Sequence, residues 1–177
     1  AMEVREAIRN YLFDKDRGIF YRSVRIDDGK ITSVDRTVDA SIMGIFLFNV
    51  FDVWEPMLES SVKVIMDKLW VKTIGGIARY ENDYYQRVQG DYSGIPGNPW
   101  IITTLWVAQY YAAKGDYAKA KELMAWVNKI KTPTNLLPEQ VDPFRGLPTS
   151  VTPLLWSHAE YLRTYIMMKK QSIYTPQ

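Results

Sequence analysis

Apolar residues recur every three to four positions over three stretches that each keep one polar side. These stretches are residues 4–13, a segment that opens at Pro56, and a segment that Asp116 would cap. Proline suits the first turn of a helix, and aspartate suits the capping position before it. One apolar stripe beside a solvated face is typical of a helix that covers a core from outside. The pattern therefore predicts three outer helices.

Three further stretches are more uniformly apolar. They begin at Asp39, at Asn98-Pro99 and at Thr152-Pro153. The first two are apolar on nearly every side and the third is mixed but broadly apolar, which predicts inner helices. Outer and inner helices then alternate along the chain. This alternation predicts an all-α fold of about six helices in hairpins, either an α/α toroid or an α-solenoid, and no repeat of fixed period supports the solenoid.

A small β-hairpin is expected near residues 19–35. Residues 19–25 and 31–35 flank Asp28-Gly29, and an Asp-Gly pair suits the tight turn between antiparallel strands. The links before the second, fourth and sixth helices are several times longer than the usual length of about 4–6 residues. If the inner helices run parallel, these three links gather on one rim. Long loops are commonly functional, so we expect the site there.

Composition narrows the class of protein. The 177 residues, 47% of them hydrophobic, fit a single packed domain spanning residues 1–177. Without cysteine, and with His158 as the single histidine, the sequence excludes disulfides, thiolate zinc sites and imidazole-rich metal sites. A net charge of +2 does not indicate a nucleic-acid surface, and no apolar run reaches the about 20 residues of a membrane span. We expect a soluble, cytoplasmic protein that binds neither nucleic acid nor membrane.

Candidate chemistry gathers in the link before the fourth helix. Arginine, aspartate and several aromatic residues lie there together: Arg79, Tyr80, Asp83, Tyr84, Tyr85 and Trp100. Aromatic rings stack on the flat face of a sugar, and forked charged groups bind its hydroxyls. The alternative interpretation is structural: an Arg79–Asp83 ion pair that fixes the loop, with the aromatic rings in the core.

The link before the sixth helix offers a further carboxylate, Glu139, followed by Gln140. Its position after a short apolar run would suit a partly buried carboxylate. A single glutamate in a loop is also commonly a solvated surface residue. His158 lies on the sixth helix between Ser157 and Ala159, without an ordered Ser–His–Asp set, and is interpreted as a hydrogen-bonded structural residue.

Four segments of this chain together resemble glycoside hydrolase family 15, the glucoamylase, glucodextranase and trehalase family. They are residues 79–85 (RYENDYY), 97–100 (GNPW), 138–140 (PEQ) and 156–157 (WS), in the family's order and with compatible spacing. The resemblance spans about residues 39–165. It implies an (α/α)6 toroid of which this chain would form the C-terminal half.

The resemblance also implies an activity. Members of the family cleave α-linked glucose from chain ends, or split trehalose, with inversion and without a metal or organic cofactor. Glu139 matches the general base, Gln140 its neighbour, and Arg79 an arginine that binds sugar hydroxyls. Tyr80, Asp83, Tyr84, Tyr85 and Trp100 match positions that line the same pocket. The substrate would be an α-glucan oligosaccharide or trehalose.

One part of the family's pattern is missing. Inverting hydrolysis needs an acid and a base about 6.5–9.5 Å apart, and the family carries its acid in the half of the toroid that this chain lacks. The similar string at residues 52–55 (DVWE) occupies a short link on the opposite rim, so Glu55 is interpreted as a solvated turn residue. The chain alone is therefore expected to be catalytically incomplete.

Several arrangements remain open. The chain would be part of a longer enzyme, or pair with another polypeptide that carries the N-terminal half, or form a homodimer whose two halves close the ring. Two alternatives lie outside catalysis: a sugar-binding or regulatory relative, and a helical scaffold for protein interaction. Every arrangement leaves apolar edges of inner helices that association would cover.

Overall fold

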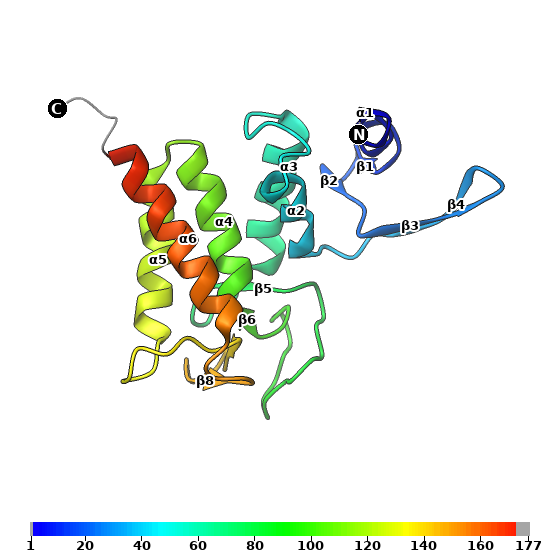
Figure 1. Cartoon of the computed structure of the whole chain (residues 1–177). Helices are drawn as coiled ribbons and strands as arrows, with labels where there is room; N and C mark the ends of the chain where they lie inside the picture. Colours follow the sequence, from blue (N-terminus) through cyan, green and yellow to red (C-terminus); the bar gives the residue numbers. More distant parts are fainter. Residues whose placement is uncertain (1, 173–177) are drawn as a thin grey trace.

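The computed structural model describes residues 2–172. Six α-helices form most of its regular secondary structure (Figure 1). In chain order they are α1 (Met2–Tyr11), α2 (Gly44–Leu47), α3 (Pro56–Leu69), α4 (Ile101–Ala113), α5 (Tyr117–Ile130) and α6 (Leu155–Ser172). A 3-10 helix, η1 (Ala40–Met43), directly precedes α2. The prediction of a mostly helical fold is confirmed, although more β-structure is present than the single hairpin expected.

Two of the three predicted outer helices, α3 and α5, form as their patterns predict, whereas α1 ends at Tyr11, short of the expected residue 13, and buries none of its residues. In α3 the buried side chains follow a helical stripe, Leu58, Val62, Ile65 and Leu69, and Pro56 occupies its first turn. In α5, Asp116 caps the first turn by accepting a hydrogen bond from the backbone amide of Lys119 at 3.0 Å. Each of these helices turns its stripe toward the core and its charged side toward solvent.

Helix α4 is the central inner helix. It packs against both α5 and α6, and most of its side chains are buried, including polar Thr103, Thr104 and Gln109. It begins at Ile101, so the prediction of a start at Asn98-Pro99 is wrong. Pro99–Trp100 instead forms strand β6, because that segment pairs with neighbours on both sides.

The second and sixth helices differ from prediction. The second consists of η1 and a single turn of α2, in which no residue is buried, and Phe48 is 81% exposed at its end. The sixth begins at Leu155 rather than at Thr152-Pro153 and leaves Leu155 83% exposed. Both were expected to be inner helices. Among residues 2–172, η1 does bury Ala40, Ile42 and Met43, whereas α6 leaves several of its apolar side chains exposed.

The strands are short and antiparallel. Strand β1 (Phe13–Asp14) pairs with β2 (Ile19–Phe20), and β3 (Ser23–Asp27) pairs with β4 (Lys30–Asp35). Asp28 and Gly29 join β3 to β4 with φ of 50° and 73°, which confirms the predicted turn. This hairpin projects away from the helices in Figure 1.

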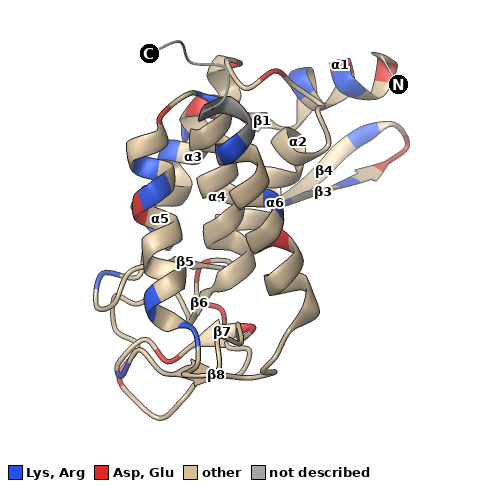
Figure 2. Ribbon diagram, turned by 60° about the vertical axis from the view of Figure 1, so that its left-hand side comes forward, with Lys and Arg blue, Asp and Glu red and all other residues tan. Residues whose placement is uncertain are grey.

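A four-stranded sheet was not predicted. Its order is β5-β6-β7-β8, from Ile77–Ala78, Pro99–Trp100, Gln140–Val141 and Pro148–Thr149. It lies across the ends of α4 and α6 where both helices begin (Figures 1 and 2). The start of η1 joins the same end, since the amide of Ala40 donates to the Arg79 carbonyl at 2.8 Å. The three long links therefore meet at one end of the helices.

Candidate active site

The register of the four-stranded sheet brings the predicted site residues together. Ile77, Trp100, Gln140 and Thr149 are paired in one row across the four strands. Arg79 lies just beyond β5, and Glu139 directly precedes β7. Because adjacent strands lie about 4.8 Å apart, segments far apart in the sequence become neighbours here.

Arg79 and Asp83 form a forked ion pair. Nε and Nη2 of the guanidinium donate to the two carboxylate oxygens at 2.8 and 2.9 Å, and Asp83 is almost wholly buried, with 1% of its surface exposed. Burial lowers the pKa of Arg79, but hydrogen bonding and charge attraction from Asp83 outweigh burial, so the pKa lies above its ordinary value. The ion pair of the structural interpretation is present.

Three aromatic rings surround the same guanidinium. Its central carbon lies 4.8, 5.1 and 4.7 Å from the ring centres of Tyr80, Tyr85 and Trp100. Trp100 is buried, whereas Tyr85 is 46% exposed, so only part of this aromatic set belongs to the core. Tyr84 is more exposed still and lies over Arg87, at 4.1 Å, rather than over Arg79. The structure thus places four of the five aromatic and arginine residues in one cluster and Tyr84 beside it.

Glu139 is half-buried and hydrogen-bonded on one side. Its Oε2 accepts a hydrogen bond from Nε2 of Gln140 at 3.1 Å and another from the hydroxyl of Ser150. Its backbone is held as well, because its amide donates to the Val151 carbonyl at 2.9 Å and its carbonyl accepts from the Ile101 amide at 3.2 Å. Glu139 is therefore a positioned carboxylate and not a free surface side chain.

Two residues important to this geometry were missed in the sequence. Ser150 follows β8 and Glu139 precedes β7, so the antiparallel pairing sets them opposite each other. Asn98, which was predicted only to mark a helix start, is 1% exposed and donates from Nδ2 to Oε1 of Gln140 at 3.0 Å. The sequence signal for the pairing of β7 with β8 was limited to the turn residues between positions 141 and 148, among them Gly146.

Glu55 does not join this cluster, and the interpretation of Glu55 as a solvated turn residue is wrong. It precedes α3 and accepts a hydrogen bond from Arg9 at 2.8 Å, with 15% of its side chain exposed. Trp70, at the other end of α3, pairs with Ile77 of the sheet. A helix of 14 residues separates the two ends by about 21 Å, at 1.5 Å per residue.

His158 has the structural role expected of it. Its Nε2 accepts a hydrogen bond from the Leu137 amide at 3.0 Å, and the neighbouring Ser157 hydroxyl donates to the Pro138 carbonyl at 2.7 Å. Together they fasten the segment before Glu139 to α6.

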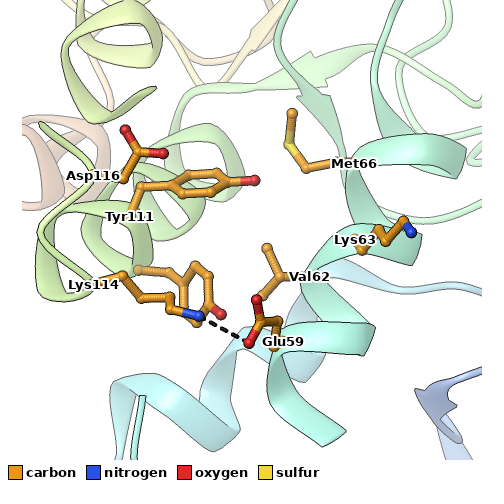
Figure 3. Close-up of a pocket in the computed structure, with 8 residues that line it drawn as sticks. Glu59, Val62, Lys63, Met66, Tyr111, Lys114 and Asp116 are labelled. Atoms are coloured by element: carbon orange, nitrogen blue, oxygen red, sulfur yellow. Dashed lines mark ion pairs between the residues drawn. The ribbon is translucent and has the colours of Figure 1, made fainter. Parts of the chain in front are cut away.

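A separate hollow of about 400 Å³ lies between α3 and the far end of α4. Figure 3 shows the Glu59–Lys114 ion pair, 2.9 Å long, at its edge and Tyr111 and Met66 across it. Burial raises the pKa of the Tyr111 phenol above its ordinary value. Because α4 begins beside Trp100 and ends beside Lys114, this hollow is distinct from the Glu139 cluster.

Neither a metal site nor a membrane span emerges from the part of the chain that the structure describes. Residues 2–172 bring no three histidine, aspartate or glutamate side chains together in a metal-binding group. No helix among them combines the length and the apolar character needed to cross a bilayer.

Comparisons of sequence place the chain among glycoside hydrolases. It is 36% identical over 168 residues to an uncharacterized glycosyl hydrolase of Methanocaldococcus jannaschii, covering 87% of this chain and 24% of that protein. It is 29% identical over 139 residues to Trehalase 1 of Sulfolobus acidocaldarius, covering 77% of this chain and 23% of the relative. The chain thus spans about a quarter of the length of these curated relatives. No protein-family profile matches it.

Solved structures share the fold. A bacterial glucoamylase crystallised with acarbose superposes with a TM-score of 0.77 at 24% identity, over 96% of this chain and 28% of that one. A glycoside hydrolase family 15 glucoamylase from Hypocrea jecorina superposes with a TM-score of 0.65 at 15% identity, over 90% of this chain and 35% of that one.

Proposed function

This chain belongs with the glycoside hydrolase family 15 proteins, and we propose that it supplies the base side of an active site that hydrolyses α-glucosidic bonds with inversion. Glu139 would deprotonate the attacking water. The observation that supports this role is the one-sided binding of its carboxylate, which is held at Oε2 by Ser150 and Gln140. A general base needs such a fixed orientation toward the proton it removes.

The Arg79 cluster would bind the glucose unit at the cleavage site. The ion pair with Asp83 fixes the guanidinium, and the buried Trp100 lies against it. Tyr80 and Tyr85, which are more exposed, provide rings on which a sugar can stack. Tyr84, exposed beside the cluster, would contact a sugar further along the chain. The substrate class is an α-glucan oligosaccharide or trehalose, as the trehalase and glucoamylase relatives suggest.

The acid side would come from outside this copy of residues 1–177. The candidate within the chain, Glu55, is paired with Arg9 at the far end of α3. A further part of a longer protein, or a second copy of the chain, would supply the acid and cover the exposed apolar side of α6. This domain would then form half of an α/α toroid.

The experiment that isolates the base side uses α-D-glucosyl fluoride, because fluoride departs without being protonated by an acid. We expect the chain to release β-glucose from it, detected by NMR of the first-formed anomer, and to act far more slowly on maltotriose and trehalose. Glu139→Gln should lower the rate at least about 100-fold. The exposed Glu122→Gln is the matched control and should leave the rate unchanged.

Three outcomes would contradict the proposal. Equal rates for the wild type and Glu139→Gln would remove Glu139 from the reaction. Release of α-glucose would exclude inversion. Binding of maltose or trehalose, seen in tryptophan fluorescence, without any turnover of the fluoride would support the sugar-binding alternative instead.

A further inference from the structure

A chain of hydrogen bonds runs from the loop before β6 to Glu139. The hydroxyl of Tyr92 donates to Oδ1 of Asn98 at 2.6 Å. Nδ2 of Asn98 donates to Oε1 of Gln140 at 3.0 Å. Nε2 of Gln140 then donates to Oε2 of Glu139 at 3.1 Å. Asn98 and Gln140 are 1% and 0% exposed, so their amides depend on one another for partners.

Two backbone groups determine which atoms donate and which accept along this series of hydrogen bonds. The Val88 amide can only donate, and it donates to the Tyr92 hydroxyl at 3.1 Å, which leaves the phenolic hydrogen for Asn98. The Gln86 carbonyl can only accept, and it accepts from Nδ2 of Asn98 at 2.8 Å. Both contacts require the amide of Asn98 to face one way. Burial raises the pKa of the Tyr92 phenol, which keeps that donor protonated.

The orientation of Asn98 determines that of Gln140. Because Asn98 presents a donor, Gln140 turns its Oε1 toward Asn98 and its Nε2 toward Glu139. The reversed amide would set a carbonyl oxygen against the carboxylate, and the two would repel each other. With Gln140 and Ser150 both bound to Oε2, hydrogen bonds from residues 2–172 reach only this oxygen of Glu139.

We propose that Asn98 is a positioning residue that, through the amide of Gln140, holds Glu139 by Oε2 and leaves Oε1 to face the reacting water. The catalytic part of this inference rests on the proposed function. The positioning part does not, since it concerns only how residues 98, 140 and 139 affect one another. Asn98 and Glu139 have no hydrogen bond to each other, so any coupling between them must pass through an intermediate or through space.

A double-mutant cycle tests the positioning on the chain itself. Asn98→Asp replaces the donor with an acceptor, which turns Gln140 around and sets its carbonyl against Glu139. Urea unfolding measures the effect of Asn98→Asp in two backgrounds, the wild type and Glu139→Gln. We expect the substitution to raise the unfolding equilibrium constant at least about tenfold more in the wild type than in Glu139→Gln. In a Gln140→Leu background this difference should vanish. Asn10→Asp, on the exposed side of α1, is the matched control and should show no coupling with Glu139→Gln.

The Gln140→Leu background separates positioning from simple charge repulsion. Coupling that persists without Gln140 would show that the two carboxylates repel directly, and would overturn the proposal. Absence of coupling in the native background would overturn it too. If Asn98→Asp fails to fold, Asn98→Ala takes its place, because it removes the donor without burying a charge. We expect its coupling with Glu139→Gln to have the same sign and to be about threefold.

Turnover of α-D-glucosyl fluoride adds the catalytic readout. Asn98→Ala should lower kcat about tenfold and leave KM nearly unchanged, because sugar binding at Arg79 is not altered. A wild-type chain that shows coupling but no turnover would refute the proposed function and leave the positioning intact. Turnover that is insensitive to Asn98→Ala, in a chain without coupling, would refute the positioning alone.

Discussion

The two carboxylates of the site differ in how much of their hydrogen-bonding capacity is occupied. Both oxygens of Asp83 are bound by Arg79, and Oδ1 also accepts from the Tyr85 amide at 2.9 Å. Glu139 accepts hydrogen bonds at Oε2 alone within residues 2–172. An occupied, buried carboxylate holds structure in place, whereas one with a free oxygen can exchange a proton. This difference supports the proposal that Asp83 fixes the loop and that Glu139 acts in the reaction.

Replacing Arg79 with lysine should destabilise the loop without removing its charge. An ammonium cannot form the forked contact with Asp83, and it lacks the planar group that lies close to three aromatic rings. We expect Arg79→Lys to lower the free energy of unfolding by about 1–2 kcal/mol, measured in urea. Arg25→Lys is the control, because Arg25 pairs with Asp27 on the exposed hairpin. Equal effects of the two substitutions would contradict this account.

Removing the Ser150 hydroxyl should leave Glu139 with Gln140 as its remaining donor. Ser150 has φ of 62°, so glycine and alanine differ there in backbone strain while both lack the hydroxyl. We expect Ser150→Gly and Ser150→Ala to lower turnover of α-D-glucosyl fluoride alike, by about tenfold. The glycine variant should be more stable than the alanine variant by about 1 kcal/mol, because alanine, like serine, carries the Cβ that strains this conformation. Full turnover in both variants would show that this hydrogen bond does not serve the reaction.

Residues close in sequence were predictable as partners, and residues joined by sheet register were not. Arg79 and Asp83 are four positions apart, so their ion pair could be foreseen. Ser150 reaches Glu139 only because β7 and β8 pair, and Asn98 reaches Gln140 only because β6 and β7 pair. Two-residue strands carry too little alternation to reveal such pairing in the sequence.

At the scale of the elements, stripes of apolar residues located α3 and α5 well, because an outer helix shows its two environments in its own sequence. The starts of the inner helices were less predictable. An Asn-Pro pair fits a helix start as well as the end of a loop. In this chain Pro99 and Trp100 form a strand, because they pair with Ala78 and Ile77. The apolar segment after Asp39 likewise forms only short helical turns.

Helix α1 is attached to the body through few contacts, and Glu55 is central to them. Arg9 donates to Glu55, and Arg5 and Arg9 lie 5.5 and 4.7 Å from the ring centre of Phe51. The attraction of Glu55 raises the pKa of Arg9 above its ordinary value, chiefly through their hydrogen bond.

Glu55→Gln should therefore loosen α1 without disturbing the sheet. The neutral amide keeps the size of the side chain but loses the charge that attracts Arg9. We expect faster tryptic cleavage within α1, with the fragment from β5 onward staying intact, as followed by mass spectrometry. Glu3→Gln, on the same helix, should leave the cleavage rate unchanged. Protection equal to that of the wild type would mean that apolar contacts, those of Ile8 and Phe51 among them, hold α1 without the ion pair.

For the molecule as a whole, the exposed apolar side chains of α6 are the feature that most needs a partner. Leu155, Trp156, Leu162, Tyr165 and Ile166 are each between 46% and 83% exposed. Leu155, Leu162 and Ile166 follow helical spacing and so form one stripe. Large apolar patches on soluble proteins mark surfaces that other segments cover.

We expect the isolated chain to self-associate through this stripe. Leu162→Glu places a charge in its middle and should lower the mass measured by light scattering toward that of one 20.6 kDa chain. Val4→Glu changes an equally exposed apolar residue on α1 and is the control. A mass that both substitutions lower equally, or that neither lowers, would show that α6 is not the contact surface.

The four-stranded sheet also bears on how the protein folds. Its strands join residues 77, 100, 140 and 149, whereas the α4–α5 hairpin is local in sequence. Contacts between distant residues close larger loops and so form later than local ones. Glu139 would acquire its neighbours only after the helices have packed. We therefore expect these few strand pairs and the arrangement around Glu139 to form and to open together, as one cooperative unit that completes the fold last.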